Sequence, residues 1–79
     1  MAEAVIVLRV LRQSDRTDRL LELIGSSLLE RPLTAHDDGT VPVRLPRRGP
    51  QAWDQLRDAL DEAGPDWRQW LHLPPRPQR

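Results

Sequence analysis

The three residues Asp37, Asp38 and Gly39 constrain this chain more than any other short segment. They lie between two extended apolar runs, at residues 28–36 and 40–45, and Asp-Gly in that setting is a strong signal for a β-hairpin. The turn needs a positive φ, which glycine adopts without steric cost. A helix-like segment flanks each run, so the predicted element order is strand, helix, hairpin, helix, strand.

The composition limits the classes of protein to consider. The chain has 79 residues, enough for one domain with a small core. It has no cysteine, which excludes disulfides and cysteine-based zinc sites. Its 12 basic and 12 acidic residues balance, so no net charge draws it to nucleic acid or membrane. The longest apolar run, Ala4–Leu8, is too short to span a bilayer and follows no basic segment. A cytoplasmic location is therefore expected.

The first half of the chain predicts a strand and then a helix. Residues 4–11 are β-branched and aliphatic, and both alternating faces are largely apolar, which is typical of a central strand. Ser14 is a suitable N-cap for the helix that follows. The helix is expected to end near Gly25–Ser27, although Leu28 and Leu29 could extend it to Glu30.

The second half predicts a strand, a helix and a final strand. Val41, Val43 and Leu45 alternate with polar residues over Thr40–Leu45, as in a strand with one buried face. Apolar residues recur at helical spacing over residues 51–63, between Pro50 and Gly64-Pro65. Trp67–Leu73 alternates like a strand, and a Pro- and Arg-rich tail follows at residues 74–79. One domain is thus expected at residues 1–73.

The resulting order β-α-β-β-α-β is that of the split βαβ unit. The chain thus resembles ferredoxin-like domains in topology, and this resemblance implies a small α+β fold with an antiparallel sheet and two helices on one face. Pro42 opposes it, because the third strand of that fold is central and proline cannot donate to a β-ladder. Either a bulge forms at Pro42 or the strand order differs. A three-stranded β-α-β-α-β layout, with residues 28–36 irregular, is the alternative.

Three tryptophans are the only aromatic residues, so each carries unusual weight. Trp53 and Trp67 fall on expected core faces, and replacing Trp53 by alanine is expected to unfold the domain. Trp70 falls on the opposite, uncovered face of the sheet. An apolar patch rimmed by polar groups commonly marks a partner site. The residues expected to bind a partner there are Val5, Val7, Arg9, Leu11, Arg68 and Trp70.

The expected function is a non-catalytic interaction or assembly module, either a homodimer or a domain that docks onto a larger protein. His36 with Asp37 and Asp38 could ligate a metal, but aspartates are expected in a tight turn for their local hydrogen bonds. The sequence has no cysteine, no glycine-rich phosphate loop and no histidine near Ser14, Ser26 or Ser27, so no catalytic residue and no cofactor is expected.

An anion or nucleic-acid site at Arg44, Arg47 and Arg48 is the alternative function, because these side chains precede the second helix. Nucleic-acid platforms of this topology stack bases on aromatic residues of the central strands, and those strands contain none here. Nucleic acid is accordingly not the expected partner.

Overall fold

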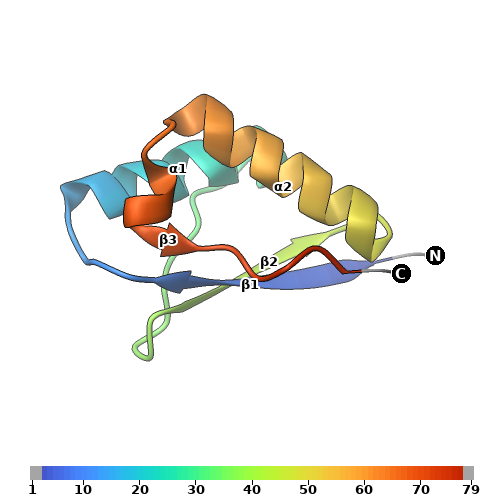
Figure 1. The fold of residues 1–79 in the computed structure, drawn as a ribbon, viewed down its shortest axis with the longest axis horizontal. Coiled ribbons are helices and arrows are strands. Elements are labelled where there is room, and N and C mark those ends of the chain that lie inside the picture. Colours follow the sequence, from blue (N-terminus) through green and yellow to red (C-terminus); the bar gives the residue numbers. More distant parts are fainter. Residues whose placement is uncertain (1–2, 78–79) are drawn as a thin grey trace.

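The computed structural model describes residues 3–77, which form one sheet layer and one helix layer. In Figure 1 the two long helices lie side by side above the sheet. The strands are β1 (Ala4–Val10), β2 (Thr40–Leu45) and β3 (Leu71–His72), and the helices are α1 (Asp15–Leu29), α2 (Gly49–Ala63) and the 3₁₀ helix η1 (Trp67–Gln69). The prediction of a small α+β domain is confirmed.

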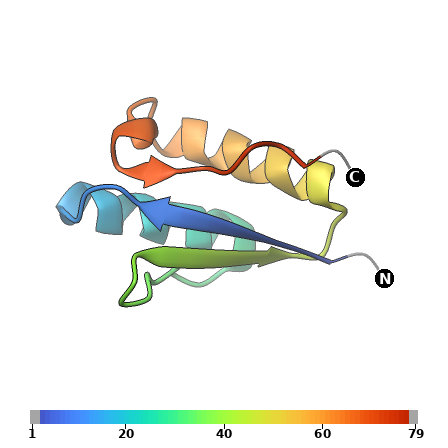
Figure 2. The same ribbon diagram turned by 60° about the horizontal axis from the view of Figure 1, so that its bottom comes forward.

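The sheet has three strands in the order β2-β1-β3, and both pairings are antiparallel. Figure 2 shows β1 between the other two strands, as expected for its two apolar faces. The four-stranded plait is not what the structure shows, because residues 30–39 contain no strand. The three-stranded β-α-β-α-β layout describes the observed order instead.

Pro42 explains why the segment before β2 does not add a fourth strand. The His36 N–H donates to the Thr40 carbonyl at 2.8 Å, on the side of β2 away from β1. Because backbone groups two residues apart point the same way along a strand, the missing N–H of Pro42 lies on that outer edge. The register with β1 continues without a bulge, with Val7 opposite Pro42. The proline therefore occupies an edge strand, because the strand that would lie outside β2 in the plait is missing from the described residues.

Helix α1 begins as the sequence predicts and ends later. The Thr17 N–H donates to the Ser14 side chain at 3.3 Å, which is a standard N-cap. The expected end near Gly25–Ser27 is wrong: the helix continues to Leu29 and ends at Glu30, which has a φ of 58°. Gly25 is buried where the following segment crosses the helix, and a Cβ there would lie 2.7 Å from the Leu33 nitrogen. Gly25 therefore lets the backbone of residues 31–33 pass close to α1, and it does not end the helix.

Helix α2 contains the residues expected of it and starts two positions earlier, with Pro50 in its first turn. Gly64 follows its last residue, as predicted. The core lies between the helices and the sheet, and every helix and strand contributes residues to it. Its buried apolar members are Ile6, Leu8, Leu20, Leu21, Ile24, Val41, Val43, Leu45, Ala52, Leu56, Ala59, Leu60, Trp67 and Leu71.

The prediction of a strand over Trp67–Leu73 is wrong for its first half. Residues 67–69 form η1, and only Leu71 and His72 pair with β1. Trp67 is buried among the core residues, and its indole N–H donates to Asp61 Oδ1 at 2.7 Å. A tryptophan at i and another at i+3 fit one turn of a 3₁₀ helix as well as they fit a β alternation.

Candidate interaction surface

One side of the sheet is not covered by the helices, and we call it the open face. On β1 it carries the side chains that alternate with the core residues, and the residues opposite them on β2 and β3 share the same side. The open face consists of Val5, Val7, Arg9, Thr40, Pro42, Arg44 and His72.

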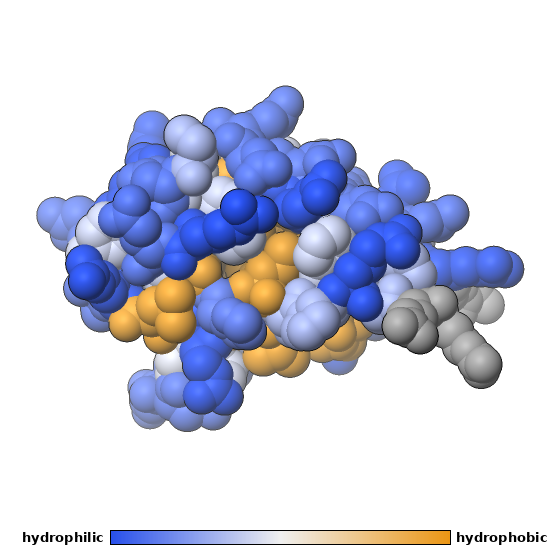
Figure 3. Space-filling model, viewed as in Figure 1, coloured by the Kyte–Doolittle hydropathy of each residue, from blue (hydrophilic) through white to orange (hydrophobic). Residues whose placement is uncertain are grey.

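The centre of the open face is apolar and accessible. Val5 is 51% exposed and Val7 is 45% exposed, and Pro42 lies directly opposite Val7. In Figure 3 hydrophobic side chains reach the surface along the lower side of the molecule, where Figure 1 places the sheet. Val5, Val7 and Pro42 thus form an exposed apolar cluster at the centre of the sheet.

Polar groups surround this centre. Arg9 and His72 are opposite each other at one end, and Arg44 lies towards the other end. The Arg44 Nε is 2.9 Å from Glu3 Oε1, an ion pair between largely exposed side chains. Arg9 has no ion-pair partner among residues 3–77. The open face therefore has a carboxylate near the start of β1 and a free guanidinium near its end.

A shallow hollow continues the open face beyond β2. It has a volume of about 220 Å³ and joins the face to the end of α1 and the segment after it. Its lining residues are Val5, Leu29, Arg31, Leu33, Pro42 and Arg44. The accessible apolar surface is thus wider than the two valines alone.

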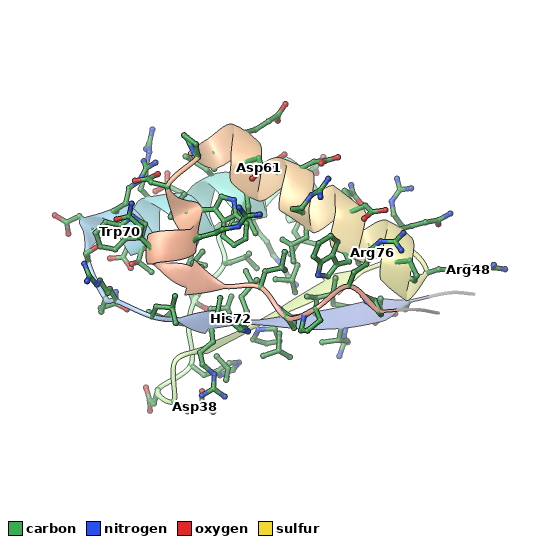
Figure 4. All side chains as sticks on the ribbon, viewed as in Figure 1. Asp38, Arg48, Asp61, Trp70, His72 and Arg76 are labelled. Carbon is green, nitrogen blue, oxygen red and sulfur yellow. The ribbon has the colours of Figure 1, made fainter. Side chains whose placement is uncertain are left out.

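Trp70 is not on the open face, which corrects the sequence prediction. It follows η1, packs partly buried against the core, and lies near the first turns of α1 in Figure 4. Its indole N–H donates to Asp66 Oδ2 at 3.4 Å, and Asp66 Oδ1 accepts from Arg16 Nη2 at 2.7 Å. The Arg16 hydrogen bond is the main reason that the pKa of Asp66 lies below its usual value. Trp70 therefore belongs to the link between α1 and η1.

Two other predicted contact residues are also outside the set that forms the open face. Arg68 is on η1, with its guanidinium carbon 5.0 Å from the centroid of the Trp67 ring. Leu11 follows the last residue of β1 and is 53% exposed. Of the six predicted partner-binding residues, the structure brings together Val5, Val7 and Arg9 on one face, with Leu11 at its end.

The Asp37–Gly39 segment forms the predicted turn, but only β2 adjoins it, so the prediction of a β-hairpin is wrong. The Asp38 carboxylate accepts from the Thr40 N–H at 3.0 Å and from the Thr40 hydroxyl, and these bonds hold the pKa of Asp38 below its usual value. Gly39 has a φ of 83°. Figure 4 shows Asp38 at the tip of the turn, away from the sheet. Within residues 3–77 no three acidic or histidine side chains are grouped to hold a metal ion.

The three arginines of the alternative anion site are not arranged around a common point. Arg44 pairs with Glu3, and Arg48 is the N-cap residue of α2 without a side-chain capping bond. Figure 4 shows Arg48 directed away from the body of the domain. Arg47 is exposed in the loop before it. The hollow that Arg44 lines, beside β2, includes neither Arg47 nor Arg48.

The part of the tail that follows β3, up to residue 77, contacts helix α2. The Trp53 indole N–H donates to the Pro74 carbonyl at 2.7 Å, and Arg76 makes a bidentate ion pair with Asp54. This pair lowers the pKa of Asp54 and raises that of Arg76. Trp53 is only partly buried, in contrast to the expected core position. The Arg-to-Asp spacing of 22 residues gives no sequence signal for this contact.

Comparisons with protein-family models, curated proteins and solved structures found no match. The fold and the surface chemistry are therefore the basis for the functional argument. None of the helices described for residues 3–77 is both long and apolar enough to cross a membrane.

Proposed function

We propose that this domain is a non-catalytic assembly module that associates with a second copy of itself through the open face. The observation that carries the proposal is the pair of half-exposed valines, Val5 and Val7, at the centre of an uncovered sheet face. Burying this apolar surface against a like surface removes it from water, which favours association.

The charges of the open face support a symmetric partner. In a two-fold arrangement with antiparallel β1 strands, the Glu3 end of one copy meets the Arg9 end of the other. Arg9 has no ion-pair partner among the described residues, so the second copy would supply its counter-charge. Docking onto a larger protein would use the same apolar centre, but nothing in the chemistry of the face specifies such a partner.

Self-association is tested by sedimentation equilibrium from micromolar to millimolar concentration, with Val7→Asp and Ala35→Asp in parallel. Ala35 is exposed in the segment between α1 and β2, so it adds the same charge away from the open face. We expect the wild-type protein and Ala35→Asp to dimerise, and Val7→Asp to weaken the dimer at least about tenfold, because a carboxylate is desolvated.

A wild-type protein that stays monomeric over the whole range contradicts self-association. If the wild-type protein dimerises and Val7→Asp dimerises equally well, the dimer exists but does not use the open face.

A further inference from the structure

The edge of β1 beside β3 is only partly paired. The Val10 N–H donates towards β2, to the Gly39 carbonyl, and the Leu11 N–H donates to the other side, to the Trp70 carbonyl, both at 2.8 Å. Since successive backbone groups alternate, Val5 and Val7 direct their N–H and C=O groups to the β3 side. β3 is two residues long and pairs only with Arg9 and Val10. Within residues 3–77 these groups of Val5 and Val7 make no hydrogen bond.

The tail passes this free edge without pairing with it. Its residues Pro74, Pro75 and Pro77 have no N–H, so they cannot donate to a strand. A groove of about 310 Å³ remains there, which we call the edge groove. It is lined by Val5, Ile6, Val7, Trp53, Pro74, Pro75 and Pro77. One wall is thus an unpaired strand edge and the other is a run of prolines.

The contacts that hold the tail are with α2 and not with the sheet. They are the Trp53–Pro74 hydrogen bond at 2.7 Å and the Arg76–Asp54 ion pair at 3.0 and 3.1 Å. Figure 4 shows Arg76 beside α2. Both side chains of the ion pair are about half exposed, and such pairs are weak. The tail can therefore move aside without breaking any hydrogen bond of the sheet.

We infer that β1 of a second copy pairs antiparallel with the Val5–Val7 edge when the tail moves aside, so that the tail regulates dimer formation. This inference rests on the proposed self-association, but it places the contact at the β1 edges, which would join the two sheets into one, and not between two open faces. The outer edge of β2 is blocked by Pro42, whereas the β1 edge offers free donors and acceptors, which are the groups that strand addition requires.

The geometry of β1 fits a second copy of itself. Pairing centred on Val5 keeps the second strand clear of β3, which begins to occupy the edge at Arg9. Val7 then faces Glu3 of the second copy, and that carboxylate is a diagonal neighbour of Arg9. This register therefore places Val5 against Val5 of the second copy and brings the opposite charges of Glu3 and Arg9 close together.

The first experiment loosens the tail in the full chain. Trp53→Phe removes the indole donor and keeps a ring, and Arg76→Asp places two carboxylates together. If the tail covers the β1 edge about nine-tenths of the time, the apparent affinity of the dimer is about tenfold weaker for each copy whose tail must move. The Trp53→Phe/Arg76→Asp variant should therefore lower the dimer Kd about 10- to 100-fold by sedimentation equilibrium. The control is Asp54→Arg/Arg76→Asp with Trp53 kept. It exchanges the two charges and so restores the ion pair, and its Kd should equal the wild-type value.

The second experiment tests the strand edge itself. Val7→Pro removes an N–H that makes no bond to β2, whereas Val7→Thr keeps the N–H and the β-branched shape. We expect Val7→Pro to abolish dimerisation and Val7→Thr to retain it, with matched thermal melts. Amide exchange of the wild-type protein offers a check without substitution: the Val5 and Val7 amides should exchange fast in dilute solution and slowly at concentrations above Kd.

The outcomes separate this inference from the proposed function. A protein that dimerises through Val7, but whose Kd is unchanged by loosening the tail and whose Val5 and Val7 amides stay unprotected, associates face to face; edge pairing is then wrong. A protein that never dimerises, even with the tail loosened, overturns both. Protection of the two amides with a tail-dependent Kd supports self-association, with the contact at the β1 edge and not between two open faces.

Discussion

Gly25 has no side chain at the point where the segment after α1 turns back across that helix. A Cβ would lie 2.7 Å from the Leu33 nitrogen and closer still to the Arg31 carbonyl oxygen, and both are backbone atoms. We expect Gly25→Ala to destabilise the domain by about 1–3 kcal/mol in urea unfolding, because this clash outweighs the better helix propensity of alanine. Ser26→Ala, at an exposed neighbour, should be neutral or slightly stabilising. Equal stability of the two variants would contradict the close approach.

Glu30 ends α1 in the left-handed region, with a φ of 58°. Residues with a Cβ pay a steric cost in this conformation that glycine avoids. We expect Glu30→Gly to raise the free energy of unfolding by about 0.5–1 kcal/mol, after the greater entropy of the unfolded glycine chain is included. Glu22→Gly, inside the same helix, should lower it by about 1 kcal/mol. Destabilisation by both substitutions would mean that the cap does not favour glycine.

The contact between Arg16 and Asp66 joins α1 to the segment before η1. The Arg16 hydrogen bond lowers the pKa of Asp66 in the folded protein below the usual value of an aspartate. A lowered folded pKa gives stability that is present above the unfolded value and is lost as the pH falls through the folded value. Stability should therefore decrease below about pH 4. Asp54 and Asp38, whose pKa values are also lowered, act in the same direction.

Urea unfolding of wild type and Asp66→Asn between pH 2.5 and 6 measures this contribution. The variant should be less stable than the wild type at pH 6, and the difference should shrink as the pH falls. Arg16→Gln/Asp66→Asn should behave like Asp66→Asn alone. A variant whose stability changes with pH as steeply as that of the wild type would show that Asp66 is not responsible.

The periodicity of the sequence predicted the strand, helix and turn whose formation depends mainly on nearby residues. The alternation of Thr40–Leu45, the helical spacing of α2 and the turn at Asp37–Gly39 all appear as expected. The fourth strand was wrong because hydrophobic pattern cannot show that the ladder donor lost at Pro42 falls on the outer edge. Trp70 was misplaced because a short 3₁₀ turn and a strand both accept its spacing from Trp67.

The candidate surface was predictable in part for the same reason. Val5, Val7 and Arg9 follow from the two-residue repeat of a strand that can be recognised from its sequence. The contacts of Trp53 with Pro74 and of Asp54 with Arg76 join residues more than twenty positions apart. No periodic pattern encodes them, and the edge groove that they frame required the structure.

The central position of β1 has a consequence for folding. β1 precedes both of its partner strands in the chain, and its partner β2 comes only after α1 and the crossing segment. The two helices can form early from local contacts, whereas the sheet must close long loops and is the slower step. Until then β1 is an apolar strand with two unpaired edges, a species that aggregates readily. The arginine within β1 and the charged residues next to it are placed to limit that aggregation during folding.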